Sequence, residues 1–289
     1  MDKLIVEVRA NEGAGRERNR NVPWSAREIA SDAAACANAG ASLIHYHCRT
    51  SDGGMDLTPE ASARAMSEVR RSSRLLQMPS MANAAGATAS ERLANLASAA
   101  DKPDFLAIEP GSANVDSFDP VDNVLLSKNR IFNNTFEDIE LFLGAASDWG
   151  AMPYLASFNI SWTRAALALV DIGWIKTPAP LLLVTGGPGF IAAHPGTPGG
   201  LDAHLSALPA ESPFEWLVCC HGGSVLELAE IAISRGGHVS IGLGDQPYSE
   251  LGSPTNAELV SRVVDMGRAL GREPATPDDL RQVFGGEAR

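Results

Sequence analysis

Short apolar runs alternate with amphipathic segments along almost the whole chain. Each run is short and continuous, as expected of strands that helices cover on both faces. The candidate strands are LIVEVRA (4–10), ASLIHYHC (41–48), LLQMPSM (75–81), FLAIEP (105–110), RIFNNT (130–135), MPYLASF (152–158), APLLLVTGG (179–187), WLVCCHG (216–222) and HVSIGLGD (238–245). Repeated strand–helix units of this kind predict a parallel sheet.

Helix start signals lie between these strands. A hydroxyl and a carboxylate three residues apart satisfy the free N–H groups of a first turn. Thr58-Pro59 places a proline at the first helical position, and Gly40 and Gly271 follow helical runs where a left-handed cap is favoured. A short terminal helix is expected from Thr276. The three capping boxes are Ser25-Ala-Arg-Glu28, Thr88-Ala-Ser-Glu91 and Thr255-Asn-Ala-Glu258.

The strand count favours a single (β/α)8 barrel, a TIM barrel, over residues 1–289. One candidate must be removed to leave the eight strands of such a barrel. We remove 130–135, which is short, polar and close to its neighbour. A doubly wound sheet is the alternative, but no glycine-rich dinucleotide fingerprint follows the first strand.

Composition narrows the function classes. The chain has 289 residues, 45% of them apolar, which suffices for a barrel-sized core. Its net charge of −12 argues against nucleic-acid binding, which needs a basic surface. No apolar run approaches the roughly 18 residues of a membrane span, and the start of the chain does not resemble a signal peptide. We expect reduced cysteines and a cytoplasmic location.

Polar residues follow several strands, at the end of a barrel that carries function. His45 and His47 end the second strand, and two residues i and i+2 share one face about 7 Å apart. Two imidazoles on an inward face are typical zinc ligands. The alternative is a pair of hydrogen-bonded core histidines. The other strand-end candidates are Asn11-Glu12, Ser80, Glu109, Thr185-Gly-Gly-Pro-Gly189, His194, Cys220-His221 and Asp245.

Several motifs together resemble the β-keto acid cleavage enzyme family, whose founding activity cleaves 3-keto-5-aminohexanoate. The resemblance extends over nearly the whole chain. The motifs are the segment VPWSAREIASDAAACANAGASLIHYHCR with its H-x-H-x-R, then MPSM, ERLANLA, PGSAN, WLVCCHGG, GGHVSIGLGD and the tail NAELVSRVVDMGRALGREPATPDDLRQV.

The resemblance implies a zinc-dependent barrel that condenses a β-keto acid with acetyl-CoA. The products are acetoacetate and a new CoA thioester. By resemblance, two strand histidines and a glutamate of the last strand hold Zn²⁺, which polarises the ketone. An arginine–aspartate pair on the last strand helps to deprotonate the substrate. A cytoplasmic homo-oligomer, a dimer or tetramer, is also implied.

Carried over position by position, His45 and His47 match the metal ligands. Ser80 matches a serine that contacts the substrate, and Asp245 matches the aspartate of the pair. We therefore expect catalytic roles for Ser80, Asp245 and the nearby Glu12. The residues expected to contact the substrate are Arg49, Glu109, Ser112 and Tyr154.

Other positions depart from the family pattern. The last strand usually contains G-G-H-V-R-V-G-[LF]-E-D-N, but here the arginine is Ser240 and the metal-binding glutamate is Gly244. Two carboxylates of the segment P-E-x-E-x-F-D are Tyr154 and Ala156, and an expected hydroxyl is Ala107. Asp245 then lacks its guanidinium partner, so weak or no cleavage of the family's usual substrates is predicted.

Three outcomes are open for the metal. Glu12 or Glu109, less readily Asp245, supplies the third ligand; His221 supplies it; or the metal is lost or weakly bound. The functional alternatives follow from these. One is a divergent acyl-transferring enzyme with a changed substrate, another is a non-catalytic binding or sensor protein, and the third is a metal-dependent hydrolase.

Recognition of acyl-CoA requires positive charge for its phosphates. The candidates are the arginines around the first loop, with a solvated basic loop as the alternative. A pocket more apolar than the family's is indicated by Tyr154, Phe158 and Trp162. The loop arginines are Arg9, Arg16, Arg18 and Arg20.

Overall fold

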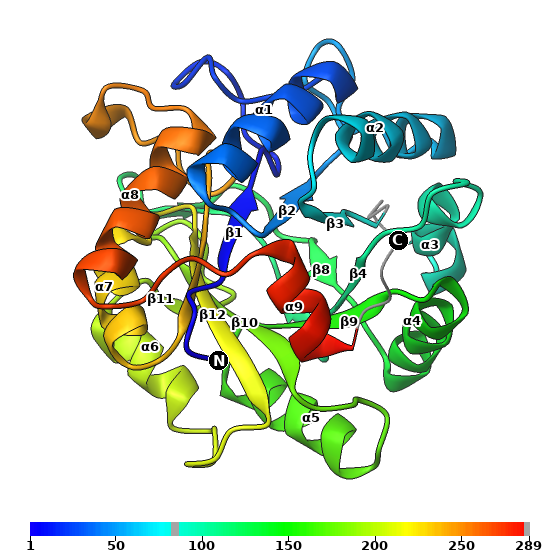
Figure 1. Ribbon diagram of the computed structural model, residues 1–289, viewed down its shortest axis with the longest axis vertical. Coiled ribbons are helices and arrows are strands. Elements are labelled where there is room, and N and C mark those ends of the chain that lie inside the picture. Colours follow the sequence, from blue (N-terminus) through cyan, green and yellow to red (C-terminus); the bar gives the residue numbers. More distant parts are fainter. Residues whose placement is uncertain (82–86, 286–289) are drawn as a thin grey trace.

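A computed structural model describes residues 1–81 and 87–285, within which eight parallel strands form a nearly closed barrel (Figure 1). Their order around the barrel is β3-β2-β1-β13-β12-β10-β9-β4. The two ends of this path meet where the Asp104 amide donates to the Gln77 carbonyl at 2.9 Å. The predicted (β/α)8 fold is confirmed. The barrel strands are β1 (Val6–Arg9), β2 (Leu43–Tyr46), β3 (Leu76–Pro79), β4 (Phe105–Ile108), β9 (Met152–Ser157), β10 (Ala179–Gly186), β12 (Phe214–His221) and β13 (His238–Ile241).

Helices surround the barrel, and five of them begin at the predicted residues Ser25, Thr58, Thr88, Thr255 and Thr276. All three expected capping boxes form, at the starts of α1, α3 and α8, and Gly40 ends α1 with a left-handed φ of 105°. The helices are α1 (Ala26–Ala39), α2 (Pro59–Ser72), α3 (Ala89–Ala97), α4 (Phe136–Trp149), α5 (Ile160–Asp171), α6 (Pro198–Leu205), α7 (Leu226–Ser234), the 3₁₀ turn η1 (Ser249–Leu251), α8 (Asn256–Ala269) and α9 (Pro277–Phe284).

Side-chain alternation along the strands separates two hydrophobic clusters. On β1, Val6 and Val8 face outward into the larger cluster between strands and helices, whereas Ile5 faces into the barrel. On β2, Ile44 faces outward and Leu43 inward. Because the faces alternate, Glu7 and Arg9 also point inward, as do His45 of β2 and His47 directly after it.

The chain between β4 and α4 leaves the barrel and forms two small antiparallel pairs. One pair joins β5 (Ala113–Asn114) to β8 (Ile131–Phe132), and the other joins β6 (Phe118–Asp119) to β7 (Val124–Leu125). The removal of 130–135 from the barrel strands is therefore confirmed. A bridge from Ser117 to Phe190 ties this excursion to the loop after β10, and β11 (His194–Pro195) extends the edge of β10.

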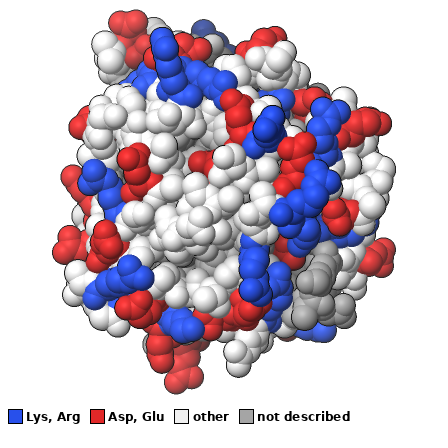
Figure 2. All heavy atoms as spheres, turned by 45° about the horizontal axis from the view of Figure 1, so that its top comes forward, with Lys and Arg blue, Asp and Glu red and all other residues white. Residues whose placement is uncertain are grey.

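The opposite end of the barrel is covered by α9, coloured red in Figure 1. Leu280 of α9 and the preceding Ala275 join Ile5 in the interior cluster. Within the described residues, no helix is long and apolar enough to cross a bilayer. On the face shown in Figure 2, acidic and basic side chains lie side by side around a largely uncharged centre, without a continuous basic surface.

Candidate active site

The loop after β1 brings a carboxylate to the two histidines of β2. Asn11 fixes this loop: its side-chain amide donates to the carbonyls of Pro23 and His47, and its oxygen accepts from the His47 amide. Glu12 follows with a φ of 35°, a left-handed conformation that non-glycine residues rarely adopt. Such backbone strain is found mainly where function requires it. Here it turns the Glu12 side chain toward the histidines.

Glu12, His45 and His47 form a compact group of possible metal ligands. Glu12 Oε1 lies 3.1 Å from His45 Nε2, and Glu12 Oε2 lies 2.7 Å from His47 Nε2. The two Nε2 atoms are 3.2 Å apart. One ligand atom from each residue lies within 4.8 Å of the others. Two imidazoles and one carboxylate match a catalytic zinc site, which keeps a further position open for substrate.

The hydrogen bonding of His45 fits a metal ligand. Its Nδ1 lies 2.8 Å from the Met78 carbonyl oxygen, which can only accept, so Nδ1 carries the proton. A neutral His45 therefore presents a bare lone pair at Nε2, toward Glu12 and His47. Second-sphere carbonyls orient metal-binding imidazoles in this way. Of the open outcomes for the metal, the structure favours Glu12 as the third ligand.

Gly244, which stands in place of the family's metal-binding glutamate, leaves the space that Glu12 occupies. A Cβ atom at position 244 would lie 2.5 Å from Glu12 Cγ and 2.8 Å from the Glu12 backbone nitrogen. Both distances are shorter than a non-bonded contact allows. The two positions thus compete for one volume, and this chain fills that volume from β1.

Arg9 joins the metal-ligand group to Asp245. Its Nη2 lies 2.6 Å from Glu12 Oε1, and its Nε lies 2.9 Å from Asp245 Oδ2. The expectation that Asp245 lacks a guanidinium is therefore wrong, because Arg9 of β1 supplies one. Arg9 is also enclosed by the two carboxylates, and Arg16 is paired with Glu28, so among the described residues Arg18 and Arg20 are the CoA candidates without an ion pair.

Buried charges in this cluster set one another's protonation. Burial alone would raise the pKa of Glu12, but Arg9 and the two histidines outweigh it and hold the pKa well below its usual range. For Arg9, burial opposes the charged form, yet Asp245 and Glu12 raise its pKa. Burial lowers the pKa of His47. An ionised Glu12 beside a neutral His47 is the state that binds a metal cation.

Four other predicted site residues reach this end of the barrel. Ser80 Oγ donates to the Met81 carbonyl at 3.1 Å, and Ser112 Oγ to that of Asn134 at the same distance. The Arg49 guanidinium donates to the carbonyls of Glu12, Ala14 and Gly53, so it holds the loop of Glu12. Burial raises the pKa of Glu109, whose Oε2 lies 4.0 Å from Arg92. Their catalytic and substrate-binding roles stay predictions.

Tyr154 lies deeper than a residue of the barrel mouth. Its side chain is 1% exposed within the interior cluster, and its hydroxyl donates to buried Glu7. Ala156, one pleat further along β9, is 7% exposed and belongs to the same cluster. The contact expected between Tyr154 and the substrate stays a prediction, although its hydroxyl is already engaged by Glu7.

An aromatic group lines the other side of the mouth. Phe158 stacks on Trp162 with ring centroids 4.3 Å apart, and Phe132 stacks against both. Phe190 packs edge-on against Phe158 at 5.6 Å and against His221 at 4.7 Å. The rings therefore extend to the edge of the charged cluster and form an apolar wall beside it. We call Phe132, Phe158, Trp162 and Phe190 the aromatic wall.

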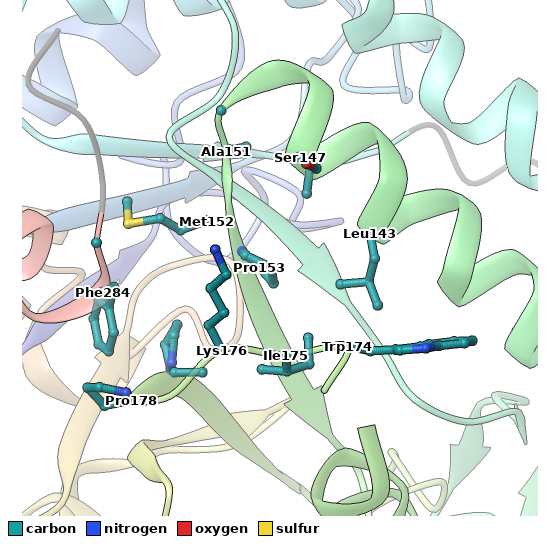
Figure 3. A pocket seen from close by; sticks show the side chains of 15 residues that line it. Leu143, Ser147, Ala151, Met152, Pro153, Trp174, Ile175, Lys176, Pro178 and Phe284 are labelled. Atoms are coloured by element: carbon teal, nitrogen blue, oxygen red, sulfur yellow. The ribbon is translucent and has the colours of Figure 1, made fainter. Parts of the chain in front are cut away.

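A separate pocket lies at the opposite end of the strands (Figure 3). It is lined by the start of β9, including Met152 and Pro153, and by the segment before β10, including Trp174 and Lys176. Phe284 of α9 closes one side. Because it lies at the amino ends of the strands, this pocket is separate from the charged cluster.

Sequence reasoning missed the role of Arg9. The signal was present in LIVEVRA, where Ile5, Glu7 and Arg9 share the inward face by alternation. Charged residues at inward positions of a buried strand are rare unless they are paired. The contribution of Phe132 and Phe190 to the mouth was also missed, since both come from loops whose course the sequence does not define.

Comparisons with known proteins identify the family of this chain. The family model described as beta-keto acid cleavage enzyme matches residues 3–285. The 3-keto-5-aminohexanoate cleavage enzyme of Acetoanaerobium sticklandii is 32% identical over 99% of each chain. The 3-oxoadipate:acetyl-CoA acetyltransferase of Cupriavidus necator is 25% identical, covering 97% of this chain and 94% of that one.

Solved structures support the fold. ObcA in a binary complex with oxaloacetate has a TM-score of 0.72 at 16% identity, covering 93% of this chain and 68% of that chain. A likeness at such low identity concerns the fold alone. The match of the family model over nearly the whole chain and the relative at 32% identity show that this protein belongs to the β-keto acid cleavage enzyme family.

Proposed function

We propose that this protein is a metal-dependent enzyme that transfers the acetyl group of acetyl-CoA to a β-keto acid and cleaves a C–C bond of the adduct. The products are acetoacetate and a new acyl-CoA. The observation that carries the proposal is the convergence of Glu12, His45 and His47 at the carboxyl end of β1 and β2. Family membership and the names of the relatives support it.

The chain's own residues have distinct tasks in this proposal. Glu12, His45 and His47 hold Zn²⁺, which when bound polarises the ketone of the keto acid as a Lewis acid. Arg9 keeps Glu12 ionised and holds both Glu12 and Asp245 in place. Arg49 fixes the Glu12 loop through three backbone carbonyls. Ser80 and Glu109 remain our candidates for contacts to the substrate.

We further propose an acyl group more apolar than an aminoalkyl chain. The aromatic wall lies beside the cluster, and the buried side chains of Tyr154 and Ala156 stand where the family pattern has two carboxylates. An ammonium group on the substrate would find no carboxylate at those positions. An aliphatic or aromatic tail would instead be stabilised by burial, by roughly 0.8 kcal/mol for each CH₂ group.

Metal content tests the proposed dependence on a metal ion. Protein purified without chelator is expected to contain close to one zinc per chain by elemental analysis, and the His45→Ala variant to contain little. Adding zinc to depleted wild-type protein should restore acetoacetate formation from acetyl-CoA and a keto acid. Protein that carries no zinc but is fully active would contradict the metal dependence.

A substrate panel tests the second part. With acetyl-CoA as co-substrate, 3-oxooctanoate is expected to have a kcat/KM at least tenfold higher than 3-keto-5-aminohexanoate. In a Phe158→Ala variant this preference should shrink, because part of the aromatic wall is removed. A wild-type preference for the amine-bearing keto acid would overturn the proposed substrate class.

A further inference from the structure

His221 has the environment of a general base. It ends β12 at the barrel mouth, where 38% of its side chain is exposed. Its Nδ1 lies 3.2 Å from Asp245 Oδ1, and the carboxylate of Asp245 is 3% exposed. Within the described residues, His221 Nε2 has no hydrogen-bond partner. A buried carboxylate therefore orients a histidine whose second nitrogen is open to the mouth.

We propose that His221 is the base that removes the C2 proton of the β-keto acid, with Asp245 and Arg9 as its positioning residues. This inference rests on the proposed function and adds a residue to it. The C2–H bond breaks, the proton passes to His221 Nε2, and the electron pair stays on the substrate as an enolate. The enolate carbon then attacks the acetyl-CoA carbonyl and forms a C–C bond, while the thioester C–S bond breaks and CoA leaves as the thiolate, which can take the proton from His221.

The geometry favours the imidazole over the carboxylate as the proton acceptor. One oxygen of Asp245 faces Arg9 Nε at 2.9 Å and the other faces His221. With both oxygens occupied and the side chain buried, Asp245 meets the substrate only through the imidazole. It fixes the tautomer with the proton on Nδ1 and stabilises the imidazolium that forms, as in an aspartate–histidine pair of hydrolases.

The charges around His221 also favour its role as a base. Burial opposes the charged imidazole, but the hydrogen bond and negative charge of Asp245, with Glu12 beyond it, raise the pKa of His221, while Arg9 counteracts them. A base with a pKa above the ordinary value of about 6.5 accepts a carbon-bound proton more readily. Phe190 packs edge-on against the His221 ring, with the centroids 4.7 Å apart.

His221 is not placed as a metal ligand. Among the described residues, the group whose ligand atoms lie within 4.8 Å of one another comprises Glu12, His45 and His47, without His221. A base and a ligand therefore make different predictions for the same substitution. Loss of a base lowers kcat and leaves zinc in place, whereas loss of a ligand lowers zinc affinity first.

The experiment measures solvent deuterium entry at C2 of 3-oxooctanoate by NMR, without acetyl-CoA and against the enzyme-free rate. Zinc-loaded wild-type protein is expected to accelerate exchange. His221→Gln should reduce the enzymatic rate about 100-fold, within the usual range for a general base, with zinc content unchanged. The matched control is His194→Gln, which replaces a histidine at the same end that accepts from the Ile160 amide.

Two further readouts separate a base from a structural role. In full turnover, His221→Gln should lower kcat with KM changed less than threefold, and the acidic limb of the pH profile should disappear. Added imidazole should restore exchange to His221→Ala in proportion to its concentration. Neither effect is expected if His221 only packs against Phe190.

The possible negative results contradict different parts of the proposal. His221→Gln exchanging at the wild-type rate, or losing its zinc, would overturn the role of His221 as base. Wild-type protein that exchanges no keto acid of the panel would contradict it as well. Exchange without acetoacetate formation when acetyl-CoA is added would instead contradict the proposed acetyl transfer and leave the base supported.

Discussion

Histidine and glutamate side chains meet at both ends of this barrel, but the hydrogen-bond partners of their nitrogen and oxygen atoms differ between the two ends. At the amino end, His238 Nε2 lies 3.1 Å from Glu215 Oε2, and His238 Nδ1 accepts from the Ile5 amide at 3.0 Å. Arg272 also reaches His238 Nδ1, at 3.2 Å. At this end each ring nitrogen has a protein partner, and His238 is fully buried.

At the carboxyl end, lone pairs face one another. With its proton on Nδ1, a neutral His45 ring turns the lone pair of Nε2 toward His47 Nε2 and the Glu12 carboxylate. Residue types and burial are similar at the two ends. The difference lies in the balance of donors and acceptors. A surplus of converging acceptors indicates a cation site, and a closed set of donors and acceptors indicates a structural link.

The sharpest test exchanges the carboxylate for an amide at each end. Glu12→Gln is expected to weaken zinc binding by on the order of 100-fold or more, because the anionic ligand is lost. Glu215→Gln should leave zinc affinity within twofold of the wild type. Competition titrations against a chelator measure both. Equal effects of the two substitutions would remove the distinction between the two ends.

Gly244→Ala tests whether the metal end depends on the space left for Glu12. The new Cβ would meet Glu12 Cγ at 2.5 Å and displace the carboxylate, so zinc affinity should fall about tenfold, or roughly 1.4 kcal/mol. Gly144→Ala is the matched control, since a Cβ there meets nothing within 4 Å on α4. Unchanged zinc affinity in Gly244→Ala would show that Glu12 does not need this space.

The structural end should be visible in the pH dependence of stability. The hydrogen bond from His238 lowers the pKa of Glu215 to about 2, below the roughly 4.3 of an unfolded chain. The stabilisation is therefore present above pH ~4.3 and is lost as the pH falls toward ~2. After allowance for solvent screening, Glu215→Gln should cost about 1–2 kcal/mol at pH 7.

Urea unfolding at several pH values measures this last effect. The difference between wild type and Glu215→Gln should shrink steadily between pH ~4.3 and ~2, because the wild-type carboxylate becomes protonated. Glu12→Gln, measured in parallel without zinc, should also lose stability at pH 7, because Arg9 and the two histidines hold the pKa of Glu12 well below its usual range. A difference that is constant with pH would argue against an ionised Glu215 as the source of the stability.

The barrel itself was predictable from local patterns. Strand runs, capping boxes and left-handed glycine caps act over a few residues, so LIVEVRA and Ser25-Ala-Arg-Glu28 already predict their elements. The histidine pair was predictable for the same reason, since alternation along one strand puts His45 and His47 on one face. Family motifs extended this to the type of reaction.

The completion of the site depended on contacts between distant segments. From the sequence, Ser240 and Gly244 suggest a site that has lost a cation and a ligand. In the folded chain Arg9 supplies a cation to Asp245 and Glu12 supplies a carboxylate to the histidines, because β1 pairs with β13 and the left-handed backbone at Glu12 turns its side chain inward. No local sequence pattern indicates that residues from β1 supply groups that the family pattern has on the last strand.

The sequence by itself therefore determined the fold class, the inward-facing histidines and the family. Tertiary structure decided which carboxylate joins the histidines, which guanidinium serves Asp245, and that His221 rests on that aspartate. The physical reason is the distance along the chain over which the interactions act. Secondary structure and side-chain alternation follow from neighbours along the chain, whereas a site of converging charges depends on which strands the closed barrel places side by side.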